Sequence, residues 1–260
     1  MPHWINPTYA LSGFIVGTLV GMTGVGGGSL MTPMLILLFG IHPSTAVGTD
    51  LLFAAATKAG GTVIHGIYQT VEWRIVGRLA AGSIPATALT ILALSVISVN
   101  ADASRTLVNG VLGSALFVTA VVLIFRQRIL AIYAAQVGEL SARKTQFCTI
   151  AFGAALGILV SISSVGAGAI GVTVLLLLYP HLPMRRIVGS DIAHAVPLTL
   201  AGGIGHWIVG STDWSLLASL LVGSLPGVFL GGRISIRIPD RVLRFLLATT
   251  LILLAVTILM

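Results

Sequence analysis

Charged residues are scarce in this sequence. Only 8% of its 260 residues are charged, whereas 56% are hydrophobic. A soluble domain carries roughly a quarter charged residues, and such a small number of charges cannot solvate a globular surface. The composition therefore predicts a chain that has lipid as its surrounding solvent, and it excludes an ordinary soluble domain.

Cysteine is also scarce, since Cys148 is the single one. One cysteine excludes an intrachain disulfide and a cysteine-rich metal site, and the sequence predicts neither a metal nor another cofactor. The first residues lack the basic stretch of a cleaved signal peptide. We therefore expect the first apolar segment to be retained.

Most of the charged residues are positive. Fourteen lysines and arginines stand against seven acids, which gives a formal net charge of +7. They lie in short gaps between apolar runs, where basic residues act as anchors on the cytoplasmic side of a membrane protein. We therefore expect the lipid bilayer as a partner, and no nucleic acid.

Polar breaks divide the chain into ten apolar segments, a pattern that predicts an all-α polytopic membrane protein. Six segments are long enough to cross a hydrocarbon core, which takes roughly 20 residues, whereas the second and the seventh are too short to cross alone. The segments are residues 8–23, 29–40, 44–67, 73–98, 105–125, 145–164, 168–179, 187–209, 214–233 and 241–259.

The two halves of the chain repeat each other, with an offset of 140 residues that becomes 141 after Pro183. The equivalent pairs are Gly26 and Gly166, Gly28 and Gly168, Asp50 and Asp191, His65 and His206, and Trp73 and Trp214. Shared histidine, tryptophan and aspartate are hard to obtain by chance in an apolar background. The sequence predicts a first transmembrane repeat at 1–126, a cytoplasmic linker at 127–144 and a second repeat at 145–260.

The positions of lysine and arginine predict how the repeats are oriented. Four basic clusters, which include Arg78, Arg128, Arg186 and Arg237, can all lie on the cytoplasmic side if both termini are outside. Each half then has an odd number of crossings, so the repeat of five plus five helical segments is inverted. Inverted repeats are typical of secondary transporters, whose sites lie near the membrane midplane where the repeats meet.

Two glycine-rich breaks, at 24–28 and 164–168, each precede one of the short segments. A helix that begins inside a membrane exposes free N–H groups and the positive end of its dipole, which together attract an anion. The alternative is close helix packing through small residues. No Gly-Lys-Ser/Thr follows either break, which excludes a soluble phosphate loop. The predicted anion-binding residues here are Gly26, Gly27, Gly28, Ser29, Ser163, Ser164, Gly166 and Gly168.

Two aspartates open long segments, Asp50 directly after Thr49 and Asp191 directly after Ser190. Either carboxylate caps its helix, or it carries protons coupled to transport, because acids at membrane depth are costly and usually functional. Thr49 and Ser190 are predicted to add hydroxyl groups to the anion site.

Lys58 lies in the middle of segment 44–67, where a lysine cannot face lipid cheaply. It either pairs with Asp50 or offers its charge to an anion, and the other half has Thr199 at the equivalent position. His65 and His206 are further candidates for proton coupling, although backbone carbonyls often satisfy such histidines. A shared metal ion is not expected, because Asp50 and His65 are separated by about 22 Å along a helix.

One set of motifs extends over nearly the whole chain. The motifs are Gly13–Gly28 followed by Pro33, Ala46–Thr49, His65 and Val71–Trp73 in the first half, and Val165–Gly168, Gly189–Ser190, His206 and Trp214 in the second. Together they resemble the sulfite exporter TauE/SafE family of membrane permeases. The resemblance implies a permease for sulfur-containing anions such as sulfite or organosulfonates, in a bacterial cytoplasmic membrane and often working as an exporter. Asp50, Lys58 and Ala167 depart from the family's pattern.

The sequence thus predicts a secondary transporter, an exporter of small sulfur-containing anions, in which one half rocks against the other. A passive anion channel would have a similar sequence and stays open, as does an assembly subunit without transport. A membrane enzyme is not expected, because no convergent nucleophile and base are found. A homodimer is one of the assemblies that the sequence leaves open.

Overall fold

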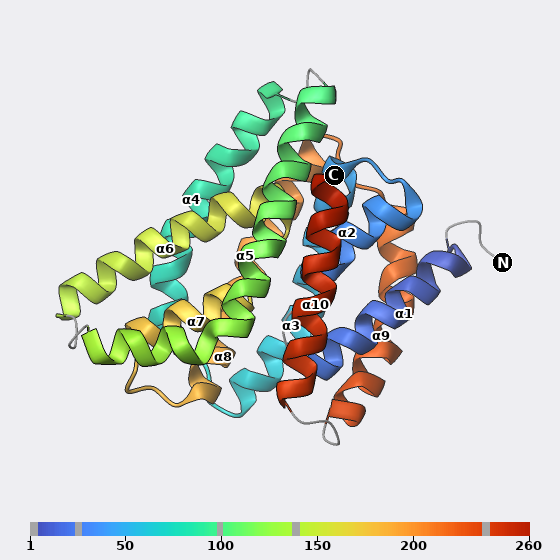
Figure 1. Ribbon diagram of the computed structural model, residues 1–260. Coiled ribbons are helices and arrows are strands. Elements are labelled where there is room, and N and C mark those ends of the chain that lie inside the picture. Colours follow the sequence, from blue (N-terminus) through green and yellow to red (C-terminus); the bar gives the residue numbers. More distant parts are fainter. Residues whose placement is uncertain (1–4, 24–27, 98–100, 137–140, 236–239) are drawn as a thin grey trace.

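The computed structural model describes residues 5–23, 28–97, 101–136, 141–235 and 240–260, which form a bundle of helices without a strand in these ranges (Figure 1). The helices are α1 (Pro7–Thr23), α2 (Gly28–Phe39), α3 (Pro43–Ile67), α4 (Trp73–Ile97), α5 (Ala101–Gln136), α6 (Ala142–Ser163), α7 (Ala169–Leu178), α8 (Met184–Ile208), α9 (Trp214–Ser235) and α10 (Asp240–Leu259). Five of them, α4, α5, α6, α8 and α9, are long and apolar enough to cross a membrane. The chain is an all-α polytopic membrane protein.

Each of the ten predicted segments corresponds to one helix, and the two short ones are α2, with 12 residues, and α7, with 10. The largest difference in bounds is in α5, which continues to Gln136 although its apolar run ends at 125. Arginine and glutamine disfavour lipid but are good helix formers, so a polar break ended the hydrophobic run without ending the helix. The first part of the predicted linker at 127–144 is therefore helical.

The helices of the two halves pack in matching pairs. The first helix of each half packs against the fourth helix of the other, as α1 with α9 and α6 with α4. The third helices pack against each other, as do the fifth, and each short helix lies against the fifth helix of the opposite half. These contacts are therefore the same when the two halves are exchanged.

Glycine brings the first and fourth helices close together. At each seam a β-carbon on the glycine would collide with the backbone of the facing helix, which is how small residues act between membrane helices. The approaches are Gly13 to Leu220, Gly17 to Ser224, Gly153 to Leu79 and Gly157 to Ser83. Both residue numbers rise together along these seams, so the paired helices run parallel.

The equivalent helices α3 and α8 cross the middle of the molecule in opposite directions. The pairs in contact are Gly48 with His206, Leu52 with Gly203, Gly61 with Ile192, and His65 with Gly189. Residue numbers rise along α3 while those of the facing residues fall along α8, so the two helices are antiparallel. The centre of the pairing is at about residues 56–57 of α3 and 197–198 of α8. In Figure 1, α5 and α10 also run antiparallel, with Gly113 against Leu259. Antiparallel equivalent helices are what an inverted repeat requires, while the orientation in a bilayer stays a prediction.

The short helices α2 and α7 are held inside the bundle. Met31 and Leu35 of α2 and Leu175 of α7 are fully buried. Helix α2 packs against α3 and α10, and α7 packs against α5 and α8. The starts of both short helices are therefore placed by the antiparallel pair at the centre.

Candidate functional site

The second glycine-rich break is a turn buried in the bundle. Helix α6 ends at Ser163, and Ser164 follows in the left-handed conformation with φ of 57°. Gly166 and Gly168 have φ values of 119° and 135°, which side chains rarely tolerate and which explain why glycine stands there. Helix α7 then begins at Ala169. The predicted interruption is therefore present, and its serines and glycines lie within one turn.

The start of α7 presents backbone N–H groups toward this turn. The first helical hydrogen bonds run from Gly171 N to Gly166 O, at 3.4 Å, and from Val172 N to Gly168 O, at 2.8 Å. The N–H group of Ala169 precedes this pattern and belongs to the positive end of the helix dipole. A break of this form has the polarity that an anion requires.

Part of the first break lies outside the described residues, namely Gly26 and Gly27. Helix α2 begins at Gly28, and Ser29 follows it as a buried residue. The Ser29 hydroxyl has no hydrogen-bond partner within the described parts of the chain. The proposed contribution of these four residues to an anion site stays a prediction.

Asp50 is completely buried on α3 and lies near α2 and the second break. The Thr32 hydroxyl on α2 donates a hydrogen bond of 2.5 Å to its Oδ2 atom. The hydroxyl of Ser164 in the second break lies beside the same carboxylate. The first aspartate is therefore held by a hydroxyl donor and faces a residue of the opposite half.

Asp191 occupies the equivalent place on α8 but has different surroundings. It is 2% exposed, and its Oδ1 atom has no hydrogen-bond partner among the residues that the structure describes. This atom lies directly against Gly171 of α7, where a β-carbon would collide with it. Where the first half has Thr32 the second has Val172, which has no hydroxyl to donate. A buried carboxylate oxygen without a donor is energetically costly.

Lys58 lies close to the centre of the α3–α8 pairing. Its Nζ atom donates to the carbonyl oxygen of Ala167 in the second break, at 3.4 Å. Both Asp50 and Asp191 lie within electrostatic range of this ammonium group. The lysine thus lies within range of both carboxylates and beside the start of α7, and no ion pair with either aspartate within 4.0 Å is found among the described residues. The choice between a carboxylate pair and an anion stays open.

His194 is a site residue that sequence analysis missed. It is completely buried on α8, and its Nε2 atom is 2.9 Å from the hydroxyl of Ser83 on α4. Its Nδ1 atom has no partner in the described ranges, and Lys58 lies within electrostatic range. The first half has Phe53 at this position, so a comparison of the halves hides the histidine. The available signal was its position three residues after Asp191, on the same helix face.

Thr49 and Ser190 are used in a different way. The N–H of Asp213 donates to the Thr49 hydroxyl at 3.1 Å, and the N–H of Glu72 donates to the Ser190 hydroxyl at 2.8 Å. Both contacts join one half to the other, at the residue before α9 or α4. These hydroxyls serve the junction of the halves, and a role in anion binding stays a prediction.

The two predicted coupling histidines lie near the far ends of α3 and α8. The Nδ1 atom of His65 is 2.7 Å from the Thr70 hydroxyl, and Nε2 of His206 donates to the carbonyl of Ser161 at 2.9 Å. Each ring has a polar partner and packs against a glycine of the opposite helix. The structure does not bring these rings into the group formed by Lys58 and the aspartates.

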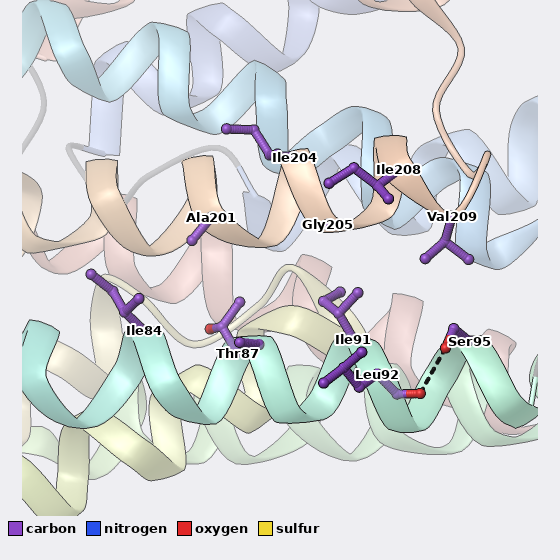
Figure 2. A pocket seen from close by; sticks show the side chains of 11 residues that line it. Ile84, Thr87, Ile91, Leu92, Ser95, Ala201, Ile204, Gly205, Ile208 and Val209 are labelled. Atoms are coloured by element: carbon purple, nitrogen blue, oxygen red, sulfur yellow. Dashed lines mark hydrogen bonds between the residues drawn. The ribbon is translucent and has the colours of Figure 1, made fainter.

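Two cavities lie away from this group. A groove of about 370 Å³ runs between α4 and α8 and is lined mainly by apolar side chains such as Ile84, Ile91 and Ile204 (Figure 2). A second cavity of about 260 Å³ contains Arg78, whose guanidinium donates to the Tyr179 hydroxyl at 3.2 Å. The apolar groove offers little to a small anion, so the buried charges at the centre are the better candidate site.

Comparison with known proteins gives a consistent picture. The sequence model of the family described as sulfite exporter TauE/SafE matches residues 9–258. "Probable membrane transporter protein YjnA" of Bacillus subtilis (strain 168) is 38% identical over 245 residues, covering 93% of this chain and 95% of the relative. "Probable membrane transporter protein YdhB" of the same organism is 32% identical over 235 residues, covering 89% and 91%. A "Probable membrane transporter protein" of Xylella fastidiosa (strain 9a5c) is 26% identical, covering 87% and 83%. No solved structure matches at a significant level.

Proposed function

Because this chain belongs to the sulfite exporter TauE/SafE family, we propose that it exports small sulfur-containing anions such as sulfite or organosulfonates. Family and relatives make it a multi-pass membrane transporter, and the relatives are named as transporters rather than as enzymes. The proposed location is the bacterial cytoplasmic membrane. The family's description supports the proposed substrate, whereas the site is argued from this chain.

The observation that carries the proposal is the position of Lys58. Its ammonium group lies at the centre of the molecule, against the second break and near the start of α7. A lysine charge and a helix N-terminus reinforce each other as a positive site. A small anion bound between them would use Ser164 and the backbone of Gly168 as further ligands, which are the groups that the sequence analysis selected.

The proposed mechanism is alternating access between two inverted halves. The antiparallel α3 and α8 carry the charged residues, and the short helices α2 and α7 place their starts beside them. In inverted-repeat transporters one half rocks against the other around a fixed central site. The buried carboxylates Asp50 and Asp191 are the candidates for coupling this movement to protons, because charge at this depth requires compensation.

Flux measurements on the purified protein in proteoliposomes test this function. The vesicles are loaded with labelled sulfite, methanesulfonate or sulfate. Efflux is compared with that from vesicles prepared without the protein. We expect saturable efflux of sulfite or methanesulfonate that depends on a pH gradient. Absence of anion flux above the protein-free control would overturn the proposal.

The same assay separates a transporter from a passive anion channel. A transporter accelerates release when unlabelled anion is added outside, because exchange completes its cycle without an empty return step. A channel shows flux that rises linearly with concentration and follows the membrane potential. Linear flux without exchange would replace the proposed mechanism by the channel alternative.

A further inference from the structure

Duplication placed an aspartate in each half, yet the structure gives the two carboxylates unequal surroundings. Asp50 accepts a hydrogen bond from Thr32 and has Ser164 beside it. Asp191 has Gly171 against its Oδ1 atom, which lacks a donor among the described residues. Asp50 Oδ1 also lacks a donor among the described residues, but the Thr32 hydroxyl supports Oδ2, whereas no printed hydrogen bond supports Asp191. Lys58 lies within electrostatic range of both carboxylates.

The charged groups around Asp191 come from few elements. Helix α3 brings Lys58 and Asp50 within reach of the cluster, and it brings His65 against Gly189, with the ring bonded to Thr70. On α8 itself, His194 lies one turn further along.

The other neighbouring helices bring no charge to this place. Helix α7 contains no titratable side chain. Helix α4 meets α8 here through Ser83, and its arginines lie in its first two turns. The charged residues of α6, Arg143 and Lys144, are exposed at its start. Lys58 is therefore the cation on which Asp191 depends within the described part of the chain.

An anion that binds Lys58 competes with Asp191 for the same positive charge. Once the ammonium group is turned to the anion, Asp191 would be left as a buried carboxylate with neither a cation nor a hydroxyl donor. An isolated buried charge of this kind is neutralised by taking up a proton rather than kept. Asp50 is left less exposed to this cost, because the Thr32 hydroxyl continues to donate to its Oδ2 atom.

We propose that Asp191 is the coupling carboxylate of this transporter, binding one proton when one anion binds Lys58, while Asp50 keeps its charge in a structural role. The proton adds to a carboxylate oxygen of Asp191 and leaves it when the anion departs and Lys58 returns. One proton moves with each anion and in the same direction. This inference rests on the function proposed above and assigns unequal roles to two equivalent residues.

The first experiment measures protons on the wild-type protein in weakly buffered detergent solution. Sulfite or methanesulfonate, whichever the flux assay shows to be carried, is added at matched pH, and a pH indicator reports proton uptake. We expect one proton to be taken up for each anion bound. Anion binding without proton uptake would overturn the coupling while leaving the proposed transport function intact.

The second experiment compares Asp191→Asn with Asp50→Asn in proteoliposomes. Exchange of labelled for unlabelled anion needs no net proton movement, whereas accumulation driven by a pH gradient does. We expect Asp191→Asn to keep exchange and to lose both gradient-driven accumulation and proton uptake. Asp50→Asn should keep gradient-driven accumulation in proportion to its exchange. The reverse pattern, or the same pattern for both variants, would overturn the assignment.

A third variant covers the case in which Asp191→Asn does not fold. Gly171→Ala places a methyl group against the Asp191 carboxylate and leaves every charged group present. We expect proton uptake on anion binding to shift in pH relative to wild type, with Gly60→Ala as the control, because a β-carbon there meets nothing. An unchanged proton uptake in Gly171→Ala would contradict the role of Asp191.

Discussion

The two halves of this molecule share their scaffold and differ at its centre. The glycine seams, the crossing of α3 with α8, and the contacts of Thr49 and Ser190 all occur twice. Departures also occur around the buried charges, where Lys58 is equivalent to Thr199 and His194 to Phe53. The two halves therefore share the frame, and residues present in one half alone distinguish the two sides of the candidate site.

This difference has a physical reason. A site on the axis between two identical halves would offer a ligand the same groups twice, so two lysines would face each other across the axis. Like charges at such short range in a low dielectric are strongly unfavourable. A single Lys58 beside the centre, within range of both Asp50 and Asp191, avoids this repulsion.

The largest expected effect comes from making the halves alike at Lys58. In Lys58→Thr the first half carries the residue that the second half already has, and the ammonium group is lost. Hydrogen bonds to charged groups contribute about 1.5–3 kcal/mol, so we expect anion affinity to fall by roughly 10- to 100-fold. Calorimetric titration of the purified variant with the transported anion measures this change.

Lys144 provides a matched control for that substitution. It is the other lysine of the chain and lies exposed at the start of α6. Lys144→Thr removes the same charge and should leave the affinity unchanged. Equal losses in both variants would mean that the lysines act through the overall field of the protein and that Lys58 does not contact the anion.

The sequence was sufficient for those parts of the fold that recur. The ten helices, the two short ones among them and the family resemblance are confirmed, because hydrophobic runs and repeated motifs report them directly. Helix α5 extends past the end of its apolar run at residue 125, because the length of an apolar run reports the contact with lipid and not the end of a helix. The packing of α3 against α8 could not be predicted from the sequence, since it depends on contacts between residues far apart in the chain.

The candidate site was predicted less completely, for a related reason. Comparing the halves selected Asp50 and Asp191 but passed over Thr32 and His194, whose equivalents are Val172 and Phe53. Those two residues distinguish the surroundings of the carboxylates. Periodicity and repetition find what the halves share, and a residue that one half acquired alone is visible only when its neighbours in space are known.

An intermediate effect is expected from the hydroxyl that supports Asp50. Thr32→Val keeps the shape of the side chain and removes the donor to Oδ2. A buried carboxylate that loses a hydrogen bond should destabilise the protein by about 1.5–3 kcal/mol, seen as a lower unfolding temperature in detergent. Thr173→Val is the control, because its buried hydroxyl bonds only to Ala169 in its own helix. Similar small losses in both variants would show that Thr32 does not support the charge.

The smallest effects are expected where the two halves agree. Thr49→Val and Ser190→Ala each remove the acceptor for one N–H group at the junction of the halves. Hydrogen bonds between membrane helices contribute about 0.6 kcal/mol on average, so each variant should unfold slightly earlier and by a similar amount. Anion affinity should not change in either. A loss of affinity in one variant alone would show that its hydroxyl contacts the anion, and the junction would then be part of the site.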